Sequence, residues 1–343
     1  MFIILFSLSA DFSAKERLNI SLEYDTNVYK SPLRENDSLI SDYNLRLQSD
    51  LTLKYSSKKH LFRSNIINGG KLFLKESDAN MLVNQGEVSY LYKSGSFAPE
   101  TGIELKDTTT AQTRQDYTLI RPFAAMNYLT ESVYLKLLAG YEKFIFDFSN
   151  NYSYESPVAG LISSFNIDEN LSINLNYLFR YMMYDSFAYR KLGNIEKDTL
   201  LTERTGNKRK DTNHSLIARL NYESDLLISL TYNPEINSSN SAGESVFRQR
   251  FQISMTSMLF FKIYLNMLLS VMISSFKDGI LISDELLLIN DNENRNYIIF
   301  KLSREVYKKT MVELKYSYYY SEFSNYITQF SRSVVSAGVC LKF

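Results

Sequence analysis

Residues 171–181 read LSINLNYLFRY, in which Leu171, Ile173, Leu175, Tyr177 and Phe179 alternate with mostly polar residues. Successive side chains of a β-strand point to opposite faces, so this period of two predicts a strand with one apolar and one polar face. The run is longer than a typical strand of a soluble protein, which has about five or six residues. It matches the roughly nine to eleven residues that a tilted strand needs to cross a bilayer.

The same alternation recurs along the chain, for example in residues 18–25, 43–54 and 312–320, and is least regular in 61–74 and 156–165. Short connections (near 56–59, 94–96, 130–132, 168–170, 224–225, 259–261 and 307–309) alternate with mostly longer ones (near 31–39, 77–80, 108–115, 147–152, 188–211, 237–244, 277–294 and 324–330). Tight turns at one end and longer loops at the other are typical of outer-membrane barrels. We therefore predict an all-β fold, a transmembrane antiparallel up-and-down barrel of about 16 strands, with a range of roughly 14–18.

The composition supports a barrel and argues against several other classes of protein. Tyr and Phe supply 26 and 22 residues, while mean hydropathy is only −0.22, too polar for a helical membrane protein. Thirty-eight cationic residues balance 38 acidic ones, which predicts no nucleic-acid partner. With one cysteine and two histidines, we expect neither a zinc cluster nor another metal or cofactor.

The polar faces of the expected strands are charged, which places them inside the barrel and the apolar faces against lipid. We predict that the following charged residues line the lumen: Arg46, Lys54, Glu87, Glu104, Arg121, Lys136, Glu142, Arg180, Arg219, Arg248, Arg250, Lys262, Lys301, Glu313 and Arg332. Arg180, Arg219, Arg248 and Arg250 come from neighbouring strands. They either form a ladder that sets a field across a pore or pair with glutamates such as Glu142 in a wet interior.

Residues 258–276 (MLFFKIYLNMLLSVMISSF) are apolar enough to suggest a membrane-spanning helix. Lys262 and Asn266 interrupt them, and a period of two persists from Ile263 to Ile273. A single helix within a run of strands has no plausible topology. We therefore predict strand structure here.

The first fourteen residues resemble a secretory signal peptide, with an apolar run and small residues before a possible cleavage after Ala10 or Ala14, although a basic start is missing. The alternative is a strand or short buried segment. With a signal peptide, residues 15–343 form a single barrel domain.

The chain ends in VVSAGVCLKF, with Val339, Leu341 and the terminal Phe343 at alternate positions. This segment resembles the C-terminal signal strand of bacterial outer-membrane proteins, which implies an outer-membrane location, periplasmic termini and the barrel-assembly machinery as a partner. Residues 23–29, EYDTNVY, resemble the opening strand of porin-like families linked to exopolysaccharide or surface-lipoprotein export. That second resemblance covers one strand and identifies no functional residue.

The two histidines offer little for catalysis. His60 is expected in a periplasmic turn, and His214, although close to Asp211 and Ser215, is adjacent to that serine and so points to the opposite face. Residues 188–211 are predicted to be a basic outer loop that is solvated, contacts anionic lipopolysaccharide, or folds into the lumen and favours anions. Residues 277–294 are too apolar for a free loop and are interpreted as a hairpin, with a partner contact or a plug as alternatives.

Two functions follow. The first is a non-enzymatic porin-like channel for passive diffusion of small hydrophilic solutes, in contact with outer-membrane lipid and lipopolysaccharide. The second is a structural, anchor or pore subunit of an envelope complex that exports polysaccharide or surface protein. A homo-oligomer is compatible with either function. An enzymatic barrel is disfavoured by the positions of the two histidines.

Overall fold

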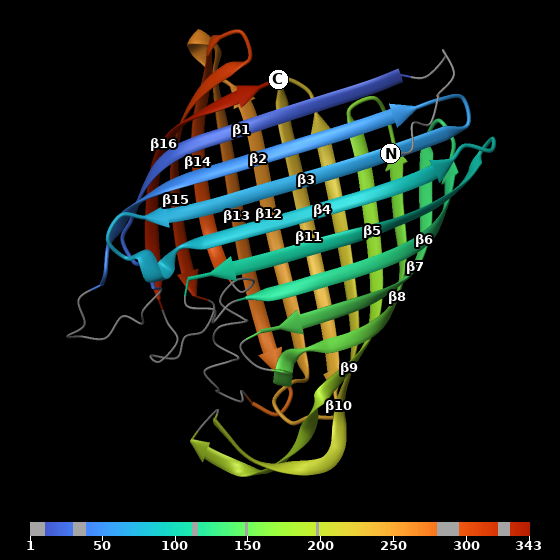
Figure 1. Ribbon diagram of the computed structural model, residues 1–343, viewed down its shortest axis with the longest axis vertical. Helices are drawn as coiled ribbons and strands as arrows, with labels where there is room; N and C mark the ends of the chain where they lie inside the picture. The colour runs from blue at the N-terminus through green and yellow to red at the C-terminus, as the bar shows by residue number, and fades with distance from the viewer. Residues whose placement is uncertain are drawn as a thin grey trace, which may run out of the picture.

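The computed structural model describes residues 11–29, 39–111, 116–147, 150–196, 199–279, 295–321 and 330–343. Within these residues sixteen antiparallel strands form one closed barrel, with three short 3₁₀ segments between them (Figure 1). The strands are β1 Asp11–Asp25, β2 Asp42–Ser56, β3 His60–Phe73, β4 Met81–Tyr92, β5 Phe97–Thr110, β6 Tyr117–Leu129, β7 Val133–Phe146, β8 Tyr154–Asn166, β9 Leu171–Glu196, β10 Thr199–Glu223, β11 Leu226–Ser239, β12 Val246–Met258, β13 Ile263–Phe276, β14 Arg295–Tyr307, β15 Thr310–Ser321 and β16 Ser331–Lys342.

Each strand pairs with its neighbours in sequence, and β1 pairs with β16 to close the sheet. The closing register runs from Arg17 opposite Lys342 to Asp25 opposite Val334. Closure leaves no unpaired sheet edge to be solvated within a bilayer. The predicted up-and-down barrel and its strand number are thus confirmed, including β3 and β8, where the alternation was weakest.

The packing is inverted relative to a soluble protein. In β1, Leu22 is 52 % exposed on the outer face, whereas Glu23 and Asp25 on the inner face are 0 % exposed. Apolar side chains cover the outside along the other strands as well, for example Phe251 on β12 and Leu314 on β15. A closed barrel with this surface is suited to hydrocarbon outside and polar groups inside.

The connections alternate in length as predicted. Those at the end that holds the termini are short: residues 57–59, 93–96, 130–132, 167–170, 224–225, 259–262 and 308–309. Most at the opposite end are longer: residues 26–41, 74–80, 111–116, 147–153, 240–245, 277–294 and 322–330. We call these the terminus end and the loop end.

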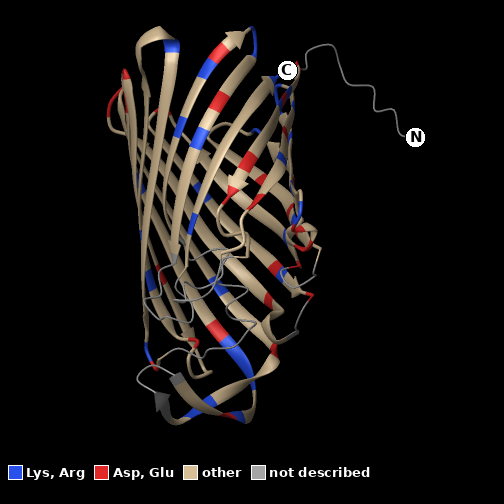
Figure 2. Cartoon of the chain, turned by 90° about the vertical axis from the view of Figure 1, so that its left-hand side faces the viewer, with Lys and Arg blue, Asp and Glu red and all other residues tan. Residues whose placement is uncertain are grey.

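The hairpin formed by β9 and β10 departs from the prediction of a loop at residues 188–211. β9 and β10 instead continue as strands on either side of residues 197–198, with register shifts at Thr199/Leu200, Leu201/Thr202, Arg204/Lys208 and Lys208/Lys210. Figures 1 and 2 show this hairpin extending beyond the other strands and curving under the loop end. The Ala242 N–H donates to the Tyr189 carbonyl at 2.8 Å, and Lys191 Nζ donates to the Asp278 carbonyl at 3.0 Å.

Residues 258–276 form the end of β12, a 3₁₀ turn at Phe260–Lys262 and β13, as the strand interpretation predicts. No helix in the described part of the chain is long and apolar enough to span a membrane. Lys262, which we expected on the inner face, lies instead in this turn with a φ of 56°. The apolar segment at 280–294 and residues 1–10 of the predicted signal segment 1–14 fall outside the described residues, whereas residues 11–14 lie in β1. Both interpretations stay predictions.

Candidate functional site: the charged lumen

The predicted lumen residues, Lys262 excepted, share one face of the barrel. Cross-strand registers join them to inward neighbours: Arg46 lies opposite Lys71, Glu104 opposite Arg121, and Arg248 opposite Glu235. Inner side chains toward the terminus end are exposed, as at Lys54, Arg219 and Glu223. Those toward the loop end, such as Glu23 and Asp211, are fully buried. The described inner wall is therefore accessible toward the terminus end, and these inner side chains are buried toward the loop end.

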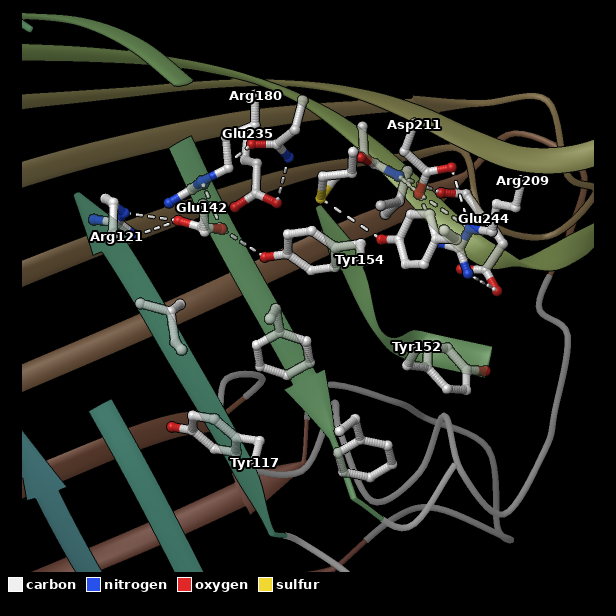
Figure 3. A pocket seen from close by; sticks show the side chains of 18 of the residues that line it. Tyr117, Arg121, Glu142, Tyr152, Tyr154, Arg180, Arg209, Asp211, Glu235 and Glu244 are labelled. Atoms are coloured by element: carbon white, nitrogen blue, oxygen red, sulfur yellow. Dashed lines mark hydrogen bonds and ion pairs between the residues drawn. The ribbon is translucent and has the colours of Figure 1, made fainter. Parts of the chain in front are cut away.

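A chain of ion pairs crosses β5 to β9 on the inner wall. Arg121 lies between two carboxylates, with Nη1 2.9 Å from Glu104 Oε2 and Nε 2.8 Å from Glu142 Oε2. Arg180 Nε approaches the other oxygen of Glu142 at 3.5 Å, and the Tyr154 hydroxyl donates to it at 2.7 Å (Figure 3). Because Glu142 is only 1 % exposed, these hydrogen bonds and ion pairs replace the water that its carboxylate would otherwise bind.

A second cluster surrounds Arg209 where the long hairpin leaves the barrel. Its guanidinium contacts Asp211 at 2.6 Å and Glu244 at 3.0 Å, and it stacks 4.0 Å from the ring centroid of Tyr184. Asn237 Nδ2 donates to Asp211 at 3.1 Å. Burial raises the pKa of Glu244, which lies in the connection after β11, and Arg209 acts against this rise. The cluster fixes that connection to the hairpin.

The two clusters border a cavity of about 500 Å³ toward the loop end of the lumen (Figure 3). Its charged lining is balanced among the described residues: Lys106, Arg121, Arg180, Arg209 and Arg248 against Glu104, Glu142, Asp211, Glu235 and Glu244. Tyrosine and phenylalanine rings, such as Tyr117 and Tyr152, complete the wall. Hydroxyls, paired charges and aromatic faces together suit a polar solute in water.

A third cluster lies where β1 meets β2, β3 and the last strands. The fully buried Glu23 is approached by Lys71 at 2.7 Å, Arg46 at 3.4 Å and Lys315 at 3.7 Å. Next to it, Arg332 of β16 pairs with the fully buried Asp25 and so joins the last strand to the first. Neither Glu23 nor Asp25 was among the predicted lumen residues, although both occupy inward positions of the first alternating run.

Several of the remaining predicted charges have local partners. Lys136 Nζ is 2.9 Å from Glu100, and Lys301 Nζ is 3.1 Å from Glu313. Arg248 contacts Glu235 at 3.5 Å, and Arg219 donates to the Thr231 hydroxyl at 3.2 Å. The four arginines predicted as a possible ladder thus contact different groups: Arg180 contacts Glu142, while Arg250 donates to the sulfur of Met272 at 3.4 Å.

The structure keeps the histidines apart from this charged wall. His60 Nδ1 lies 2.8 Å from the Tyr90 hydroxyl near a short turn, and His214 Nδ1 lies 2.7 Å from the Tyr177 hydroxyl on the outer face. Ser215 faces inward, where Asn233 donates to its hydroxyl at 3.2 Å. Asp211, His214 and Ser215 therefore form no triad. The described residues bring together no group of three or more histidine, cysteine or acidic side chains that could hold a metal ion.

No protein-family model and no curated protein matches the sequence. The fold does match solved structures. The outer-membrane expressed OmpT of Vibrio cholerae aligns with a TM-score of 0.54 and 13 % identity, over 99 % of this chain and 100 % of that one. Pseudomonas putida OprB aligns with a TM-score of 0.52 and 9 % identity, over 98 % and 94 % of the two chains. The chain thus has the porin-like barrel fold of bacterial outer-membrane proteins.

Proposed function

We propose that the chain is an outer-membrane channel through which small hydrophilic solutes diffuse passively. The observation that carries this proposal is the inverted barrel: an apolar outer face encloses a charged lumen that is exposed toward its terminus end. Sixteen-stranded barrels are wide enough to hold water as well as side chains. Paired charges along the wall supply hydrogen bonds to a passing solute without a chemical step, so the proposed function is non-enzymatic.

The orientation belongs to the same proposal. Outer-membrane barrels have short periplasmic turns and longer outer loops, so the terminus end would face the periplasm and the loop end the exterior. The β9–β10 hairpin would then lie outside, with Lys210, Arg204 and Lys208 available to anionic lipopolysaccharide. The outward Val339 and the terminal Phe343 would serve the assembly machinery during insertion.

The test is conductance of the purified protein in planar lipid bilayers, together with swelling of liposomes in isotonic sugars of increasing size. We expect stable ion-conducting openings and a cut-off in solute size. The folded state is checked first by the shift in gel mobility between unheated and heated samples. A folded protein that inserts but neither conducts nor admits any sugar would overturn the proposal. Co-purification of such a silent barrel with other envelope proteins would instead favour the export-complex subunit.

A further inference from the structure

The lumen contains a second, smaller cavity whose charges are not balanced. This cavity of about 240 Å³ lies on the inner wall where β14, β15 and β16 meet β1 and β2. Among the described residues that line it, the charged side chains are Arg17, Arg46, Lys301 and Lys315 on the positive side and Glu313 alone on the negative side. The larger cavity, with five charges of each sign, is neutral by comparison.

The contacts of these residues show how much positive charge is left over. Arg17 pairs with Asp50 at 3.2 Å and Lys301 with Glu313 at 3.1 Å, so these four charges cancel. Two other side chains of the lining, Arg46 and Lys315, have Glu23 as a shared partner. Because Lys71 also contacts that carboxylate, three cations share one negative charge.

The excess charge faces the lumen. Glu23 is fully buried, whereas the side chains of Arg46 and Lys315 are 37 % and 23 % exposed. Asn19, Ser21, Gln48 and Ser336 add polar groups to the same cavity. Hydrogen-bonding capacity and positive charge thus coincide here.

We propose that this cavity is a binding site for a small oxyanion, of the phosphate or carboxylate type, and that it makes the channel favour anions. The proposal rests on the proposed channel function. The volume is below the roughly 300–1,000 Å³ of sites for drug-sized ligands, which limits the ligand to a few heavy atoms. Arginine and lysine side chains around a pore select anions, and an excess of two positive charges matches one divalent oxyanion.

Binding is measured by calorimetry on the detergent-solubilised protein with inorganic phosphate and, separately, succinate, which distinguishes the two kinds of oxyanion. Lys315→Gln and Arg46→Gln each remove one cation while two others stay near Glu23. We expect each to weaken binding about fivefold, equivalent to about 1 kcal/mol for one charge pair in a water-like medium. Arg304→Gln removes an outward arginine, so this control should bind as the parent does. Arg219→Gln removes an inward arginine away from the cavity and should weaken binding less than Lys315→Gln or Arg46→Gln.

The selectivity is read from the reversal potential across a salt gradient. The parent should favour chloride over potassium, and Lys315→Gln should reduce that preference more than Arg219→Gln does. The inference is overturned if neither anion binds, if Arg219→Gln weakens binding equally, or if the open channel favours cations. A protein that binds phosphate or succinate but never conducts would retain the site and refute only the channel function.

Discussion

The Arg209 cluster offers the sharpest test of how charge holds the loop end together. Its side chain is 8 % exposed, and its partners Asp211 and Glu244 are 0 % and 12 % exposed. Arg209→Met keeps much of the volume but leaves two neighbouring carboxylates in a low-dielectric site without their cation. Removing one partner of a buried ion pair costs about 3–5 kcal/mol. We expect the free energy of unfolding to fall by about 4 kcal/mol, within that range.

The assay is urea unfolding in lipid vesicles, followed by gel mobility and by tyrosine fluorescence, because the chain contains no tryptophan. A variant that carries Arg209→Met, Asp211→Asn and Glu244→Gln together removes the buried charge and should recover most of the loss. A loss below about 1 kcal/mol in the single variant, or equal losses in the single and triple variants, would refute the reasoning.

The pH dependence supplies an independent check. Burial raises the pKa of Glu244 above its ordinary 4.5, so folding favours the protonated carboxyl. That contribution to stability is complete below the unfolded pKa and is lost as pH rises through the folded pKa. Without Arg209 the rise is larger, because the group that opposed it is gone. The deficit of Arg209→Met should therefore shrink as pH is lowered, and a constant deficit would contradict this assignment.

Three further predictions concern other parts of the barrel. A Cβ at Gly338 would lie 2.5 Å from the Ile20 carbonyl across the closing seam, so Gly338→Ala should lower stability by about 1–3 kcal/mol in urea unfolding, and an unchanged midpoint would contradict this. Burial and a 2.8 Å hydrogen bond to Glu76 raise the pKa of Tyr29 to about 12. A difference titration at ultraviolet wavelengths between the parent and Tyr29→Phe should show this ionisation. The neutral phenol stabilises the fold fully below about pH 10, the unfolded pKa, and this contribution is lost as the pH rises through about 12. Deletion of Phe343 should reduce insertion into membranes in cells without changing refolding in detergent, and equal yields in cells would contradict its role as an assembly signal.

The barrel and its inner face could be predicted because lipid imposes a strict alternation on every membrane-spanning strand. The same rule explains the failure at 188–211, where β9 and β10 leave the barrel. There the two strands no longer separate an outer apolar face from the lumen, so the alternation disappears while backbone pairing continues. The pattern of residue types reflects the surroundings of each face of a strand. Backbone hydrogen bonds between two strands depend little on residue type, so the sequence does not reveal them.

The charged clusters were only partly predictable. Period two places Arg121 and Glu142 inside, but their contact depends on the register between β6 and β7. Arg209 falls in the segment predicted as a loop, and its partner Glu244 belongs to the connection after the next strand, β11. Glu23 was visible as an inward residue of the first strand, yet its three cationic neighbours come from β2, β3 and β15, which only barrel closure brings together.

The outer part of the long hairpin has a consequence for how copies of the protein behave when crowded side by side. Beyond Tyr184 and Asp211, the described strands β9 and β10 pair with no third strand, so they form a two-stranded ribbon. Its edges are covered only in part, by hydrogen bonds to the connection after β11 such as that from the Ala242 N–H to the Tyr189 carbonyl. Such edges recruit strands from neighbouring molecules and seed aggregates. Here register shifts interrupt the ribbon, and Lys191, Arg204 and Lys210 add like charge that repels a second copy. The basic character of this hairpin is thus also a safeguard against self-association through β-pairing.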